Sequence, residues 1–236
     1  MSLFKRLFVL GRPASGKSEF LDFMRKLPDK ERAEKFHVGK MAELDDFVWI
    51  WEKGEEDALW EKVIGKRLHT RRVDCGFMFD FELYDFLIEK LNFEACRKYL
   101  GNEEFYTNNT LLIEFSRGGE KPYSDALKRF DPKIFESSAI LYIEVSGEES
   151  ARRNEARYRK KLESSILAHK VPDEEMNRIY KNDDWHKITE GKRNGRIRLN
   201  GVDVPFVTMN NEPESTDPKI LVPRYQAALT TLWENY

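Results

Sequence analysis

Residues Leu3–Lys26 read LFKRLFVLGRPASGKSEFLDFMRK, and this stretch decides the fold. Leu3–Leu10 is a short apolar run closed by a glycine, which is typical of a buried strand. Apolar residues recur with helical spacing over Ser18–Lys26, so this segment is predicted to be a helix. The loop between them, Gly11–Ser18, fits the phosphate-binding pattern G-x-x-x-x-G-K-[ST] at every fixed position.

Each fixed residue of this phosphate loop has a physical role. Gly11 and Gly16 let the backbone curl so that its N–H groups face phosphate oxygens. The following helix adds its positive N-terminal end, Lys17 can reach the β- and γ-phosphates, and Ser18 offers a hydroxyl to Mg²⁺. The expected cofactors are ATP and Mg²⁺, although the motif does not separate ATP from GTP. The predicted nucleotide-binding residues of the loop are Gly11, Arg12, Pro13, Ala14, Ser15, Gly16, Lys17 and Ser18.

Composition restricts the class of protein. The chain has 236 residues, 40% hydrophobic and 35% charged, which suits a single α/β domain over residues 1–236. The formal net charge of −2 does not favour a dedicated nucleic-acid or membrane binder. Cys75 and Cys96 are too few for a disulfide framework. No segment has the ~20 apolar residues of a membrane span, and Met1–Leu10 lacks signal-peptide features, so a cytoplasmic protein is expected.

Strands and helices are predicted to alternate along the chain, which indicates a parallel sheet with helices on both faces. Asn200–Gly201 is a favoured two-residue turn and predicts a hairpin between its flanking runs. The further predicted strands are Glu34–Val38, Thr110–Phe115, Ala139–Val145, Arg196–Leu199 and Val202–Val207. The further predicted helices are Ala42–Trp51, Ala58–Leu68, Phe81–Leu100, Glu148–Lys161, Asp173–Tyr180 and Pro223–Trp233.

Missing motifs disfavour other nucleotide-binding classes. The guanine-reading N-K-x-D segment is absent, since Asn182-Asp183-Asp184 lacks the lysine, and so is the L-S-G-G-Q segment of transporter ATPases. Hexameric ATPases usually carry two adjacent acids at the end of the second nucleotide strand, whereas Thr110–Phe115 carries Glu114 alone. These absences favour a kinase.

Two charged residues lie at the end of that strand. Glu114 is the candidate for a second Mg²⁺ ligand beside Ser18, because open α/β sheets place their ligands at the carboxyl ends of strands. Arg117 follows at once and is predicted to hold an anion of the acceptor, with a solvated loop arginine as the alternative.

A second basic feature follows the strand Ala139–Val145. Residues 152–161 contain six basic side chains and one acid, Glu155, although the whole chain is slightly acidic. Arg153, Arg157 and Lys160 share one stripe of the predicted helix. Phosphoryl transfer builds charge on equatorial oxygens, so we predict a lid at about residues 148–185 whose arginines, Arg153 and Arg157, stabilise it.

Together these features resemble the nucleoside and nucleotide kinases of the P-loop superfamily. The late strand Val204–Met209 also resembles the strand before that family's adenine-contacting loop, which makes Asn210 a predicted nucleotide-binding residue. The resemblance implies a five-stranded parallel sheet of order 2-3-1-4-5, a lid, and an acceptor site between strands 2 and 3. It also implies that Arg153, Arg157 and Arg159 are lid arginines.

Departures from the family concern the acceptor. Deoxynucleoside kinases carry Glu-Arg-Ser after strand 3, whereas this chain has Glu-Phe-Ser-Arg, with the arginine displaced to Arg117. Adenylate-kinase-like proteins carry Asp-Gly-Phe-Pro-Arg there, which is missing. Residues 39–108, the expected acceptor-binding helical region, match no family pattern.

The acceptor region nevertheless contains candidates. A carboxylate often orients or deprotonates an acceptor hydroxyl, and Asp45, Asp46 and Asp80 are the acids considered. The basic cluster His69–Arg72 binds an anionic acceptor or lies at a helix C-terminus. Aromatic residues are dense between Phe47 and Phe93, which indicates core packing or stacking on a base.

The sequence therefore predicts a P-loop kinase that passes the γ-phosphoryl group of ATP·Mg to a small, nucleoside-like or nucleotide-like acceptor. Its expected catalytic residues are Lys17, Arg117, Arg153 and Arg157, with Ser18 and Glu114 as metal ligands. Two alternatives stay open: an ATP-binding regulatory protein without phosphotransfer, and a kinase acting on nucleic-acid ends. The oligomeric state does not follow from the sequence.

Overall fold

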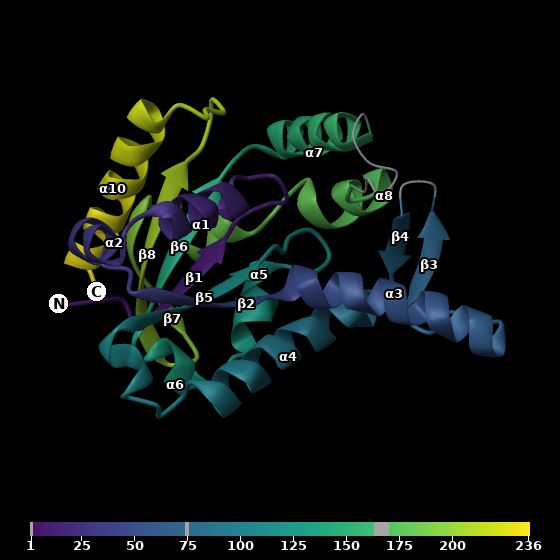
Figure 1. The fold of residues 1–236 in the computed structure, drawn as a ribbon, viewed down its shortest axis with the longest axis horizontal. Helices are drawn as coiled ribbons and strands as arrows, with labels where there is room; N and C mark the ends of the chain where they lie inside the picture. The colour runs from purple at the N-terminus through teal and green to yellow at the C-terminus, as the bar shows by residue number, and fades with distance from the viewer. Residues whose placement is uncertain (1, 74–75, 163–169) are drawn as a thin grey trace.

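A computed structural model describes residues 2–73, 76–162 and 170–236. Its main sheet has six strands in the order β2-β5-β1-β6-β8-β7 (Figure 1). A separate hairpin consists of β3 and β4. The strands are β1 Arg6–Leu10, β2 Lys40–Asp45, β3 Thr70–Val73, β4 Gly76–Phe79, β5 Asn109–Phe115, β6 Ser138–Glu144, β7 Asn194–Leu199 and β8 Val202–Asn210.

Helices cover both faces of the main sheet. α1, α2 and α10 pack on one face, while α4, α5, α6 and α9 pack on the other. The helices are α1 Lys17–Lys26, α2 Asp29–Phe36, α3 Asp46–Ile64, α4 Phe81–Lys98, α5 Tyr123–Lys128, α6 Pro132–Phe135, α7 Gly147–Leu162, α8 Asp173–Glu175, α9 Trp185–Ile188 and α10 Pro218–Glu234, with short turns η1 Phe105–Thr107 and η2 Met176–Tyr180.

The central strands contribute to two hydrophobic cores, one on each face of the sheet. β1, β5 and β6 are buried on both faces, so they read as nearly continuous apolar runs. One core forms where Phe8 and Ile113 face α4 and α5, and the other where Leu7 and Val9 face α1 and α10. Within the described residues, no helix combines the length and apolar character that a membrane span requires.

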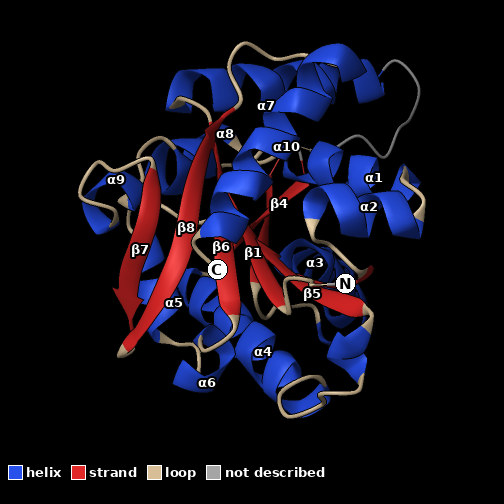
Figure 2. Cartoon of the chain, turned by 90° about the vertical axis from the view of Figure 1, so that its left-hand side faces the viewer, coloured by secondary structure: helices blue, strands red, loops and turns tan. Residues whose placement is uncertain are grey.

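The sheet differs from the five-stranded expectation by one strand. β2, β5, β1, β6 and β8 are mutually parallel and follow the predicted order 2-3-1-4-5. β7 adds a sixth, antiparallel strand at the edge beside β8 (Figure 2). The predicted hairpin is confirmed: Asn200 and Gly201 have φ of 47° and 87°, which a two-residue turn of this kind needs.

Two predictions between residues 34 and 68 are wrong. Glu34–Val38 is not a strand, because α2 runs to Phe36 and ends at His37 in a left-handed conformation. The second strand is β2, an edge strand in which only Leu44 is fully buried, so its sequence pattern is weak. The helices predicted over Ala42–Trp51 and Ala58–Leu68 are replaced by α3, which begins after β2 and ends before β3.

Candidate active site

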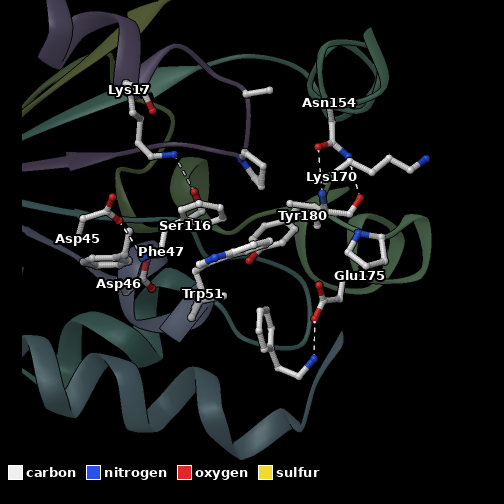
Figure 3. A pocket seen from close by; sticks show the side chains of 18 of the residues that line it. Lys17, Asp45, Asp46, Phe47, Trp51, Ser116, Asn154, Lys170, Glu175 and Tyr180 are labelled. Atoms are coloured by element: carbon white, nitrogen blue, oxygen red, sulfur yellow. Dashed lines mark hydrogen bonds between the residues drawn. The ribbon is translucent and has the colours of Figure 1, made fainter. Parts of the chain in front are cut away.

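A cavity of about 290 Å³ opens at the carboxyl ends of β1, β2 and β5. Parallel pairing aligns these ends, since Glu114 is in register with Val9 on one side and Asp45 on the other. Figure 3 shows Lys17, Asp45 and Asp46 at one end of the cavity and Asn154, Lys170 and Glu175 at the other. The described walls comprise the phosphate loop, the N-terminal half of α3, the β3–β4 hairpin, the end of β5, and residues of α7, α8 and η2.

The phosphate loop has the conformation its glycines allow. Gly11 has a φ of 148°, and a Cβ there would lie 2.4 Å from the Ile143 carbonyl oxygen. Gly16 has a φ of 107°, and a Cβ there would lie 2.3 Å from Nδ2 of Asn211. A side chain at either position would therefore clash with the adjoining strand ends. α1 begins directly after Gly16, so its N-terminus points at the cavity.

Lys17 is held inside this loop. Its Nζ donates to Oγ of Ser116 at 2.7 Å and to the carbonyl oxygens of Gly11 and Arg12, each at 3.1 Å. Glu114 lies 3.9 Å away. Burial lowers the pKa of Lys17, whereas the neighbouring carboxylates raise it. The ammonium is positioned at the centre of the loop, where phosphate oxygens would replace its backbone partners.

Two carboxyl groups at strand ends have raised pKa values. Burial raises the pKa of Glu114 to about 7, with Lys17 opposing the shift. Burial and the neighbouring Asp46 raise the pKa of Asp45 to about 6. Ser18, in the first turn of α1, is exposed and lines the same cavity. These hard oxygen donors fit Mg²⁺, which usually takes one or two protein oxygens together with substrate phosphates; in the described ranges no group of three His, Cys, Asp or Glu could hold a metal alone.

Asp46 and Arg117 form a buried ion pair. Nη1 of Arg117 donates to Oδ2 of Asp46 at 2.7 Å, and Arg117 is only 1% exposed. The same guanidinium donates to the carbonyl oxygens of Ser116, at 2.6 Å, and Tyr84, at 2.9 Å. Burial raises the pKa of Asp46, and Arg117 opposes that shift. The structure thus places Arg117 in the cavity wall, with Nη1 and Nη2 bound to Asp46, Ser116 and Tyr84 of the protein itself.

The third acid considered from the sequence lies elsewhere. Asp80 is exposed between β4 and α4 and is not part of the cavity wall. Asp45, in contrast, lines the cavity at the N-cap of α3, where its Oδ1 accepts the Phe47 N–H at 2.8 Å. Of the three, Asp45 and Asp46 line the cavity, and Asp46 is paired with Arg117.

The arginines of the predicted lid have different surroundings. Arg153 is buried and donates to Glu149 at 2.6 Å and to the Asn211 carbonyl oxygen at 2.8 Å, so it faces away from the cavity. Arg157 lines the cavity and forms an ion pair with Glu19 of α1. Arg159 is exposed and pairs with Glu155. Part of the predicted lid, residues 163–169, lies outside the described residues.

The loop after β8 contacts the phosphate loop through a residue that the sequence prediction missed. Asn210 is exposed and bonds with the Glu212 backbone. Asn211 is buried, and its Nδ2 donates to the Ser15 carbonyl oxygen at 2.7 Å. The only sequence signal for Asn211 is its place directly after the strand.

Arg12 links the phosphate loop to the far wall of the cavity. Its guanidinium donates to the carbonyl oxygens of Val145, at 2.7 Å, and Tyr180, at 2.9 Å. It also lies 2.7 Å from Oδ2 of Asp183, which accepts the Tyr142 hydroxyl as well. A nominally variable position of the motif therefore joins three segments.

The far half of the cavity is largely aromatic. The Trp51 and Phe77 rings lie 5.4 Å apart, and those of Phe77 and Phe79 lie 5.5 Å apart. Phe77 packs on the α3 backbone at Gly54, where a Cβ would approach the ring to 2.1 Å. Tyr180 of η2 completes this part of the wall.

Polar contacts attach the β3–β4 hairpin to α3 and α8. The buried Asp57 of α3 accepts the backbone N–H of Leu68 and His69 and the Thr70 hydroxyl, at 2.7–3.1 Å. On the other side, Glu175 of α8 accepts the backbone N–H of Phe79 in β4 at 3.3 Å, and also the Tyr84 hydroxyl of α4 at 2.9 Å. The hairpin is thereby fixed between α3 and α8, a role that the sequence did not reveal.

The basic cluster His69–Arg72 is not part of the cavity. Arg71 pairs with Glu174 and Arg72 with Glu61, both on the surface. The two arginines therefore connect the hairpin to α8 and α3.

Comparisons with known proteins find similar structures but no matching sequence family. The sequence matches no family model and no curated protein. The structure is similar to Kti12 from Chaetomium thermophilum in complex with ADP-AlF3, with a TM-score of 0.52, 13% identity and 98% of each chain covered. A gluconokinase from Sinorhizobium meliloti 1021 shares 16% identity over 100% of this chain and 97% of that chain, with a TM-score of 0.41. A sugar kinase from Janibacter sp. HTCC2649 shares 14% identity over 96% and 95%, also with a TM-score of 0.41.

Fold and site together define the class. The strand order, the phosphate loop at the end of β1 and the likeness to Kti12 show that the chain has the kinase-like P-loop NTPase fold. At this level of identity the likeness concerns the fold and does not resolve a subfamily.

Proposed function

We propose that this protein is an ATP-dependent phosphotransferase that moves the γ-phosphoryl group of ATP·Mg to a hydroxyl of a small, uncharged, nucleoside-like acceptor. The observation that carries the proposal is the single cavity that contains the phosphate loop, the strand-end acids and an aromatic chamber. A nucleotide and an acceptor bound in one cavity would be close enough for direct transfer.

The nucleotide-binding part of the proposal rests on the phosphate loop. Its N–H groups and Lys17 would bind the β- and γ-phosphates, while Ser18 and Glu114 would hold Mg²⁺ directly or through water. Bound Mg²⁺ would neutralise charge on the phosphate oxygens. Arg157 would face the same phosphates from α7, and the segment Asn210–Asn211 would lie beside the base. Kti12, which shares the fold, has been crystallised with ADP-AlF3.

Asp45 is the proposed general base. Its pKa of about 6 leaves it ionised at neutral pH and makes it more basic than an ordinary aspartate. The acceptor hydroxyl would give its proton to Asp45 as its oxygen bonds to the γ-phosphorus, and the bond from that phosphorus to the β–γ bridging oxygen would break to release ADP. Asp46, paired with Arg117, would hold the start of α3 in place.

The charges of the far half favour an uncharged acceptor. Arg117 is paired with Asp46, and Lys170 is paired with Glu155 at 2.7 Å and Asp173 at 2.8 Å. Among the described residues of that half, each cation therefore already has a carboxylate partner. Aromatic rings would instead contact a flat, apolar face of the acceptor.

ADP release from ATP·Mg tests this proposal with a panel of acceptors. We expect nucleosides to stimulate release and the matching nucleoside monophosphates to have little effect. Lys17→Ala should abolish the stimulation. ATP binding without stimulation by any neutral acceptor would contradict phosphotransfer and favour a protein that only binds the nucleotide. Stimulation by monophosphates alone would contradict the uncharged acceptor.

A further inference from the structure

Glu175 of α8 is a buried carboxylate in the cavity wall that the proposed phosphoryl transfer does not use. It is 4% exposed, and Figure 3 shows its side chain at the end of the cavity opposite Lys17. Its Oε1 accepts two hydrogen bonds, from the Phe79 N–H at 3.3 Å and from the Tyr84 hydroxyl at 2.9 Å. These bonds come from β4 and α4, so they fix the position of the carboxylate in the wall.

The second oxygen of this carboxylate has no such partner. Within the described parts of the chain, Oε2 of Glu175 accepts no hydrogen bond and forms no ion pair. Arg71, a cation whose charge acts on Glu175, is bound to Glu174 at 2.8 Å. Burial raises the pKa of Glu175, and the bond from Tyr84 opposes that shift. A desolvated carboxylate oxygen without a donor is costly, so a ligand that supplies a donor is favoured.

We propose that Glu175 selects the acceptor by accepting, with Oε2, a hydrogen bond from an N–H group on the edge of a nucleobase. This inference rests on the proposed transfer of a phosphoryl group to a nucleoside. Lys17 and Asp45 lie at the end of the cavity where the acceptor hydroxyl would meet the γ-phosphate, and Glu175 lies at the other end. In a nucleoside, the far edge of the base is the part most distant from the 5′-hydroxyl. Trp51 and Phe77, which also line the cavity, would contact the flat face of that base.

A fixed carboxylate oxygen distinguishes between base edges. It can only accept hydrogen bonds, so it favours an N–H over a carbonyl oxygen, a bare ring nitrogen or a methyl group at the same place. Uridine and inosine each carry a single N–H on the base, and methylation at N3 of uridine or N1 of inosine removes it. Loss of a hydrogen bond to a charged group corresponds to a decrease of about 10–100-fold in affinity or kcat/KM.

ADP release by the full chain tests the proposal with two matched pairs, uridine against 3-methyluridine and inosine against 1-methylinosine. For at least one pair, kcat/KM should be about 10–100-fold higher with the parent nucleoside than with the methylated one. Glu175→Gln keeps an oxygen for Phe79 and Tyr84 but presents an amide N–H₂ to the cavity, so kcat/KM for the parent should fall toward that of its analogue. Glu174→Gln, at the exposed neighbouring residue, is the matched control and should keep the wild-type preference.

Binding of the same four nucleosides, measured by isothermal titration calorimetry, separates this inference from the proposed function. A parent nucleoside that binds more tightly than its analogue, with the difference lost in Glu175→Gln, would support the role of Glu175 even where no ADP is released and phosphotransfer is refuted. Circular dichroism melting would verify that the variants are folded.

Three results would overturn the inference. The first is equal binding and use of parent and methylated nucleosides by wild type. The second is a preference that persists in Glu175→Gln, because a methyl group that merely collides with the wall is rejected by both proteins. The third is a failure of all four nucleosides to bind to wild type.

Discussion

The phosphate end of the cavity and its proposed acceptor end are built from different kinds of structure. At the phosphate end the working groups are backbone N–H groups, two glycines and side chains at the ends of paired parallel strands. At the acceptor end they are aromatic side chains on α3, a small hairpin and a short π-helical turn. The first is a property of local chain geometry, whereas the second depends on segments brought together from distant parts of the sequence.

This difference indicates which substitutions each end of the cavity tolerates. Backbone-built sites fail when a glycine or the central lysine is replaced, because the conformation itself is the binding group. Side-chain-built sites can alter their selectivity one residue at a time while the fold persists. We therefore expect substitutions at the two ends to separate nucleotide binding from acceptor use.

Asp45→Asn is expected to give the largest difference between the effect on acceptor use and the effect on nucleotide binding. It removes the proposed base and leaves the phosphate loop intact. Acceptor-dependent turnover should fall by about 10²–10⁴-fold. Nucleotide affinity, measured by titration with a fluorescent ADP analogue, should stay within a factor of a few. Asp80→Asn is the matched control outside the cavity and should leave turnover unchanged. Equal losses in both Asn variants would remove Asp45 from the mechanism.

Arg117→Ala tests the border between the two ends. Removing one partner of the buried pair leaves Asp46 uncompensated, so the free energy of unfolding should fall by about 3–5 kcal/mol in a denaturant titration. Combining Arg117→Met with Asp46→Leu should restore much of that stability. If Arg117 instead bound an acceptor anion, its loss would raise the acceptor KM and leave unfolding unchanged.

Gly54→Ala should disturb the acceptor end alone. The new Cβ would overlap the Phe77 ring and shift it by an amount that costs about 1–3 kcal/mol. We expect roughly a tenfold rise in acceptor KM, by the usual 1.4 kcal/mol per tenfold, with unchanged nucleotide affinity. In a Phe77→Ala background the same substitution should add little. A Gly54→Ala effect that persists without the ring would place its cause elsewhere.

A further effect concerns the pH dependence of stability at the phosphate end. Glu114 has an ordinary value of 4.5 but a pKa of about 7 in the folded chain. It therefore holds its proton more tightly when folded, and its contribution to stability is lost as pH rises from 4.5 to 7. Without Mg²⁺, the Tm of wild type should fall more steeply over this range than that of Glu114→Gln, by roughly 2–4 °C per kcal/mol. Parallel curves for the two proteins would show that Glu114 does not carry this pH dependence.

The strand and helix that flank the phosphate loop were predicted because their sequence signals are local. The loop, the strand β1 and the position of Glu114 at the end of β5 follow from short patterns with fixed spacing. Strand pairing also places Glu114 beside Asp45, although the two residues are 69 positions apart. No local sequence pattern predicts this neighbour.

The acceptor end was not predictable for physical reasons. β2 is an edge strand with one fully buried residue, so its sequence shows almost no apolar pattern. The strands β3 and β4 have four residues each, too few for a periodic signal. Arg117 lines the cavity, but its ion pair with Asp46, 71 positions away, is a tertiary contact that the sequence does not show. The presence of α7 was predicted, whereas the opposite surroundings of Arg153 and Arg157 depend on how that helix is rotated.

Arg12 has a consequence for how sequences of this type diverge. The loop pattern treats its second position as free, yet here the guanidinium is bound to two carbonyl oxygens and to Asp183. In an evolving lineage, loss of the arginine would leave the Asp183 carboxylate in a buried setting without its cation, which selection disfavours. We therefore expect positions 12 and 183 to be inherited as a pair, so that their joint presence, more than the loop alone, would identify chains that share this cavity.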